Sequence, residues 1–268
     1  MGPILIAMIA GGSGCATAPH TNLANDEIRE GYLRTSLRDA LERRRSGAAA
    51  AHEIAASFWR SGLTDSSRAY LELAIAIDAT HLASLTWLSR IYYEQGAYSA
   101  GINLLEPVIE ERDLPDPEIL ANLSVLKLAT GELSAAEELL RTCTELHPHY
   151  APAFGNLGYL HLQLGEHEQA ASELREAILL DTTMPEFHNN LGIVYRRTGR
   201  FDEAVREFGA AIELEPEFRE AHHNLALLYK LYLADEHRAR QHFRSFLALG
   251  GRADQDVTAL FRLAEEIR

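Results

Sequence analysis

The sequence predicts an all-α fold, a right-handed superhelical solenoid of six helix pairs with a capping helix at each end. Three observations predict it: small and apolar side chains recur every 34 residues, a glycine recurs at one place in each period, and prolines follow the second helices. Each helix pair leaves an apolar face that only a neighbouring pair covers. The pairs are therefore expected to stack into one array.

The periodicity is clearest in three segments that align without gaps and begin at Pro117, Ala151 and Pro185. Glycine at position 15 is expected to end each first helix, because glycine enters the left-handed conformation cheaply. Pro148 and Pro216 stop second helices. Position 8 is small, so that the two helices of a pair approach closely. The residues in phase at positions 7, 8, 15 and 20 are Leu123, Leu157, Leu191, Ser124, Gly158, Gly192, Gly131, Gly165, Gly199, Ala136, Ala170 and Ala204.

This pattern resembles the tetratricopeptide repeat (TPR), two antiparallel helices in 34 residues. The best match is 187–216, with Leu191, Gly192, Tyr195, Gly199, Phe201, Ala204, Phe208, Ala211 and Pro216. In the last repeat Ala239 and Phe243 come one place late, which predicts a longer turn. Amphipathic helices at 26–47 and 254–268 are expected to cover the ends. The repeats are expected at 48–81, 82–116, 117–150, 151–184, 185–218 and 219–253.

Residues 1–14 carry no charge, and their apolar run from Ile4 to Ala10 is far shorter than the ~20 residues of a membrane-spanning helix. The end of this segment, 12–15, resembles the lipobox of bacterial lipoproteins, although Gly12 stands where that family prefers leucine. The resemblance implies a signal peptide over 1–14, lipidation of Cys15, and a tether over 15–25. Ala16 then implies an outer-membrane lipoprotein that faces the periplasm. The alternative is a cytoplasmic protein with a misread start.

Charge and motifs exclude several functions. A net charge of −14 argues against duplex nucleic acid as the main partner. The sequence holds no metalloprotease, hydrolase-elbow, phosphate-loop or paired-cysteine motif, so it predicts neither an enzyme nor a cofactor. Cys143 and the histidine pairs are interpreted as packed or solvated side chains, not as metal ligands; the pairs are His147 with His149 and His222 with His223.

Binding residues are expected on the inner face of the first helices. In TPR proteins that bind extended peptides, asparagines on this face form a ladder, since an amide both donates and accepts. The alternative is that these asparagines only pack the helices. An apolar partner segment with an acidic end would complement a groove that is apolar and then basic. The position-6 asparagines are Asn122, Asn156, Asn190 and Asn224, and other inward positions add Tyr159, Leu162, Asn189, Ile193, Arg196, Arg197, His223 and Lys230.

One lipobox, six repeats and a closing helix resemble the outer-membrane lipoproteins that act as pilotins for type IV pilus secretins (the PilF, PilW and Tgl group). The resemblance implies a non-catalytic scaffold that binds a partner protein, as an extended peptide or a helix, in its groove. Two alternatives remain open at this point. One is an envelope adaptor for peptidoglycan enzymes, and the other is a cytosolic chaperone or regulatory adaptor.

Overall fold

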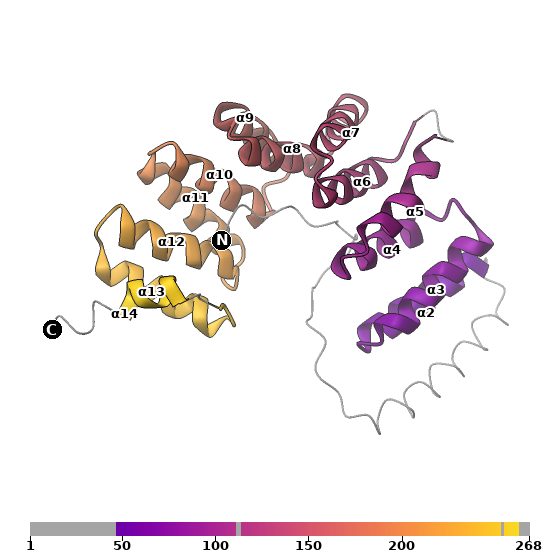
Figure 1. The fold of residues 1–268 in the computed structure, drawn as a ribbon, viewed down its shortest axis with the longest axis horizontal. Coiled ribbons are helices and arrows are strands. Elements are labelled where there is room, and N and C mark those ends of the chain that lie inside the picture. Colours follow the sequence, from indigo (N-terminus) through magenta and orange to yellow (C-terminus); the bar gives the residue numbers. More distant parts are fainter. Residues whose placement is uncertain (1–46, 111–113, 253–254, 263–268) are drawn as a thin grey trace, which may run out of the picture. The chain divides into compact units, whose positions relative to one another are not determined.

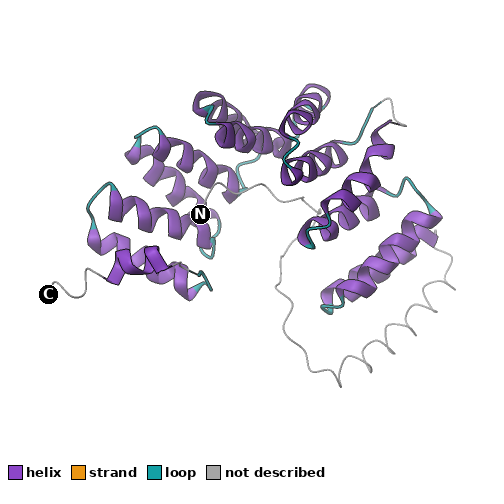
Figure 2. Ribbon diagram, in the orientation of Figure 1, coloured by secondary structure: helices purple, strands orange, loops and turns teal. Residues whose placement is uncertain are grey.

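The computed structural model describes residues 47–110, 114–252 and 255–262 (Figure 1). In these ranges every regular element is an α-helix (Figure 2). None of these helices is both long enough and apolar enough to cross a membrane. The expected signal peptide, the tether with Cys15 and residues 26–46 of the helix expected at 26–47 lie outside the described residues.

Twelve of the thirteen helices in the described ranges form six consecutive pairs, which confirms the predicted fold class. The last helix, α14, follows the sixth pair. The helices are α2 Gly47–Arg60 with α3 Thr64–Ile77, α4 Leu82–Glu94 with α5 Tyr98–Glu110, α6 Pro117–Thr130 with α7 Leu133–Leu146, α8 Ala151–Leu164 with α9 His167–Leu180, α10 Pro185–Arg197 with α11 Phe201–Leu214, α12 Arg219–Leu231 with α13 Glu236–Ala248, and α14 Gln255–Arg262.

The chain divides into two compact units, with the boundary between Leu139 and Leu140 inside α7. In the carboxyl-terminal unit, first helices α8, α10 and α12 lie in a row, and each pairs with the helix that follows it (Figure 1).

The close approach of the two helices within a pair depends on the small residue at position 8. A Cβ added at Gly192 would lie 2.7 Å from the ring of Phe208, and one added at Gly158 would lie 2.7 Å from Leu174.

The turn inside each pair follows the glycine pattern until the last pair. Gly165 and Gly199 have φ of 81° and 76°, the left-handed conformation expected of position 15. The turn between α12 and α13 lacks a glycine and places Ala234 at φ 52°. The extra residue predicted there is thus accommodated by an alanine in a conformation that costs more without glycine. Asp235 then caps α13 by accepting a hydrogen bond from the Arg238 backbone N–H.

The end of the carboxyl-terminal unit is covered by α14. Its Phe261 is buried and stacks on Phe243 of α13, with ring centroids 4.0 Å apart. Val257 and Leu260 pack against the same core. An array of repeats needs such an end because the last pair otherwise exposes its apolar face.

In the amino-terminal unit α2 packs on α3, α4 packs on α5, and α6 packs on both α4 and α5. Its core contains Leu71, Leu88 and Ile91. The first helices α2 and α4 also meet through aromatic rings, since Trp59 and Trp87 have centroids 6.1 Å apart. The first turn of α6 begins with a proline, and Asp116 caps it by accepting from the Glu118 backbone N–H.

Candidate functional site

The first-helix face of the carboxyl-terminal unit, formed by α8, α10 and α12, is the candidate binding surface. Of the residues predicted to line it, Tyr159, Arg196 and Lys230 are half-buried and Arg197 is exposed. The other residues predicted to line it are buried in the structure. These buried residues are Leu162, Asn189, Ile193 and His223.

The four position-6 asparagines are buried, each with at most 2% of its surface exposed. The Asn224 amide donates to Asn189 Oδ1 across 2.9 Å, from α12 to α10. In the amino-terminal unit the Asn122 amide donates to Ser89 Oγ across 3.3 Å, from α6 to α4. These bonds join adjacent first helices, so they favour the packing alternative for Asn122 and Asn224. Asn156 and Asn190 are equally inaccessible, and a ladder presented to solvent does not form in this structure.

The basic residues of this face differ in what they contact. Arg197 Nη1 donates to the Leu162 backbone carbonyl across 3.2 Å. Lys230 Nζ lies 2.6 Å from Glu236 Oε2, and Arg240 pairs with the other oxygen of the same carboxylate. Arg197 and Lys230 are therefore both engaged within the protein, but only the charge of Lys230 is neutralised by a carboxylate.

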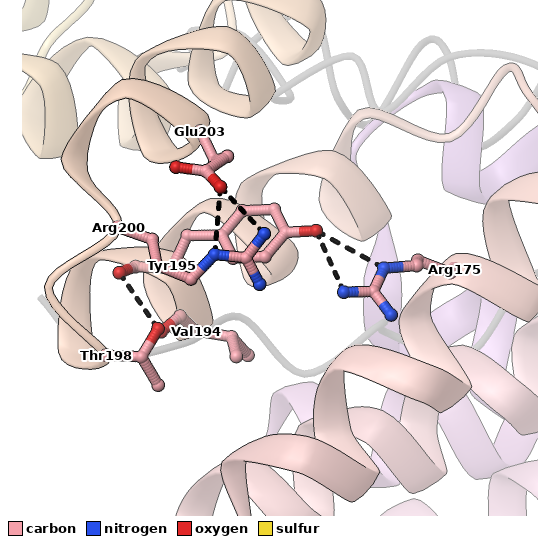
Figure 3. A network of polar contacts seen from close by, with 6 residues as sticks. All are labelled: Arg175, Val194, Tyr195, Thr198, Arg200 and Glu203. Atoms are coloured by element: carbon pink, nitrogen blue, oxygen red, sulfur yellow. Dashed lines mark hydrogen bonds and ion pairs between the residues drawn. The ribbon is translucent and has the colours of Figure 1, made fainter.

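Further basic residues are engaged around Tyr195, which the TPR pattern places at position 11 of its repeat (Figure 3). Arg175 Nε and Nη2 donate to Tyr195 Oη across 3.2 and 3.1 Å. The Arg200 guanidinium lies 4.3 Å from the centre of the Tyr195 ring and pairs with Glu203. This network joins α9, α10 and the start of α11. The 34-residue pattern contains Tyr195 but gives no signal for its arginine partners.

Two histidines meet between α12 and α13. His222 Nδ1 and His242 Nδ1 are 3.0 Å apart, and His222 Nε2 lies 3.2 Å from the Pro216 carbonyl oxygen. Burial, the nearby His222 and Arg238 lower the pKa of His242 to about 4. His242 is therefore neutral at pH 7. No three His, Cys, Asp or Glu side chains gather as metal ligands in the described ranges.

Glu118, in the first turn of α6, is a half-buried acidic residue of the amino-terminal unit. Burial, together with the charge of Asp116, raises its pKa from 4.5 to about 7. The folded protein therefore binds the Glu118 proton more tightly than the unfolded chain does. The stability that this proton contributes is fully present below the unfolded pKa and is lost as pH rises through about 7.

Glu118→Gln is therefore expected to raise the melting temperature over the wild type at about pH 8, and to raise it less at about pH 6. Thermal melts of both proteins at the two pH values check this, and an equal gain at both contradicts it.

Two family models match the carboxyl-terminal unit, over residues 158–199 (TPR repeat) and 185–218 (tetratricopeptide repeat). They coincide with the helix pairs in which the glycine turns and the close approach at Gly158 and Gly192 are seen. Residues 158–218 are thus similar to tetratricopeptide repeats. No curated protein matches the chain.

Solved structures extend the TPR likeness to most of the chain. The APC/C hetero-tetramer Cut9-Hcn1 matches with a TM-score of 0.74 and 17% identity, over 87% of this chain and 45% of that one. The chain thus spans less than half the length of the chain it matches there. TTC0263, a thermophilic TPR protein in Thermus thermophilus, matches with a TM-score of 0.57 and 20% identity, over 75% and 99%. MamA matches with a TM-score of 0.52 and 23% identity, over 61% and 94%. At these identities the likeness shows the fold alone.

Proposed function

We propose that this chain is a non-catalytic TPR scaffold that binds a segment of a partner protein on the first-helix face of its carboxyl-terminal unit. The observation that carries the proposal is the row of α8, α10 and α12, which presents Tyr159, Leu227 and Arg196 as partly accessible side chains above a continuous core. A rigid row of helices loses little conformational entropy when it binds a partner, which favours such a surface for recognition.

We further propose that Cys15 is lipidated and holds the scaffold at the bacterial outer membrane, facing the periplasm. The lipobox-like end of the amino-terminal segment supports this placement. Several acyl chains anchor a protein stably, whereas one chain alone gives only marginal binding. In that position the scaffold would serve as a pilotin or assembly factor for an outer-membrane machine such as a type IV pilus secretin.

Substitutions on opposite helices of one pair test the binding surface. Full-length protein carrying Tyr159→Glu on α8 is compared with Leu179→Glu on α9, where Leu179 is 76% exposed. Each protein is used to capture partners from bacterial envelope membranes, with quantitative mass spectrometry as the readout. We expect one set of proteins to be enriched by the wild type and by Leu179→Glu, and lost with Tyr159→Glu.

The reverse pattern, loss with Leu179→Glu only, would place binding on the second helices and contradict the proposed surface. Far-UV circular dichroism of all three proteins verifies that each is folded.

The lipid anchor is tested separately, by metabolic labelling with an alkyne fatty acid. Label is expected on the wild type and absent from Cys15→Ala, and a wild type without label contradicts the lipid anchor.

A further inference from the structure

Arg196, in the last turn of α10, is a half-buried cation for which the structure provides no counterion. No described residue forms a hydrogen bond or an ion pair with its guanidinium, whereas Arg197, Arg200 and Lys230 each have a partner. A charge that is partly withdrawn from water without a partner is costly. An anion that reached this guanidinium would recover part of that cost.

Electrostatics around Arg196 agree with this interpretation. Burial lowers the pKa of its guanidinium, the charge of Arg197 lowers it further, and Tyr232 opposes the change. No carboxylate contributes to the balance. An arginine side chain nonetheless stays protonated in proteins, so the group remains a cation at neutral pH.

A second hydrogen-bond donor, Tyr232, is near enough to act on the charge of Arg196. Tyr232 directly follows α12, the neighbouring first helix, and is 51% exposed. Its ring rests on Phe201, with centroids 4.8 Å apart, which limits its movement. The Tyr232 phenol O–H is a further hydrogen-bond donor for an anionic group of a partner. Leu227, a half-buried residue of the same α12, supplies apolar surface on this face.

The geometry points to a subsite in which Arg196 and Tyr232 receive the carboxylate of an Asp or Glu side chain in a partner segment whose neighbouring residues are apolar. This inference rests on the proposed function of the first-helix face. A single carboxylate fits one unpaired guanidinium, and Arg–carboxylate pairs are often bidentate. A polyanion such as nucleic acid or an anionic membrane is opposed by the net charge of −14.

The experiment selects peptides from a random phage-displayed library on the full chain and repeats the selection on Arg196→Gln. Arg206→Gln is the matched control, because Arg206 is an exposed arginine on the second helix α11. We expect wild-type and Arg206→Gln selections to share an acidic residue at one fixed position within an apolar motif. With Arg196→Gln the acidic preference should disappear while the apolar motif remains.

A selected peptide then gives the quantitative result. Replacing its acidic residue with Gln should weaken binding to the wild type about tenfold or more, and should change binding to Arg196→Gln little. Tyr232→Phe removes the hydroxyl but keeps the ring, so it should cause a smaller loss. This variant keeps the test decisive if Arg196→Gln proves unstable.

The outcomes separate the two proposals. Wild-type peptides without an acidic preference overturn the subsite and leave the binding surface standing. A selected peptide is also synthesised with phosphoserine in place of its acidic residue. Tighter binding of the phosphoserine peptide would show that the site takes a phosphate, and this result also overturns the carboxylate subsite. A library that yields no wild-type binder overturns the proposed function, and the subsite falls with it.

Discussion

Replacing Phe208 with alanine is expected to lower the free energy of unfolding of the carboxyl-terminal unit by about 3–5 kcal/mol. The Phe208 side chain is fully buried in α11 and belongs to the core that joins α8 to α14. Its ring faces Gly192, so no larger neighbour on that side would fill the cavity left by truncation. The loss therefore includes both the transfer of the ring from water and a persistent void.

Leu214→Ala is the matched control for Phe208→Ala, since Leu214 lies on the same helix and is 41% exposed. It is expected to cost less than about 1 kcal/mol. Because helix-pair arrays need not unfold in one step, urea unfolding followed by circular dichroism should be combined with hydrogen exchange of α10 and α11. Equal losses of unfolding free energy for the two variants would show that the Phe208 contacts do not stabilise the α10–α11 pair more than an exposed leucine does.

Gly192→Ala is expected to destabilise the same unit by about 1–3 kcal/mol, although alanine is the better helix former. The added Cβ would lie 2.7 Å from the Phe208 ring, well inside an ordinary carbon contact. The ring cannot move freely because it is itself buried. Either α10 and α11 separate or the ring leaves its preferred rotamer, and both responses are costly.

Gly209→Ala is expected to change the free energy of unfolding in the opposite direction to Gly192→Ala. Gly209 directly follows Phe208 in the sequence. Gly209 lies inside α11, and nothing stands within 4 Å of a Cβ placed there. This substitution is expected to stabilise by about 0.5–1 kcal/mol, through the smaller loss of backbone entropy on folding. Melting curves of the two variants decide the matter, and a gain for Gly192→Ala contradicts the close-approach argument.

Combining Gly192→Ala with Phe208→Leu completes a double-mutant cycle. If the clash is the cause, the double variant is less destabilised than the sum of the single changes, because the ring that the new Cβ meets is gone. Strict additivity would indicate that the two positions act independently.

The period of 34 residues was sufficient to predict the helix pairs and the glycine turns from local chemistry. Gly165 and Gly199 are in the left-handed conformation because the chain must reverse there within two or three residues. The one-residue shift near Ala239 and Phe243 likewise corresponds to the longer turn that contains Ala234. Such features depend on residues close together in the sequence, so a single sequence reveals them.

The asparagine set shows where the sequence left the answer open. An amide at position 6 is equally compatible with a peptide ladder and with bonds between helices. The Asn224–Asn189 contact depends on how α12 stacks on α10, which no local pattern states. The same holds for the basic residues, because Lys230 is neutralised by Glu236 from the following helix.

The sequence by itself therefore determined the repeat, the order of its helices and the positions that must be small. Only the tertiary structure decided which polar side chains bond to other residues of the protein and which are available to bind a partner. Arg175, Arg197 and Lys230 find acceptors within the carboxyl-terminal unit, and Arg196 does not. The physical reason is that periodicity specifies which face of a helix a residue occupies, whereas hydrogen bonding and desolvation depend on the atoms that the adjacent helices bring to that face.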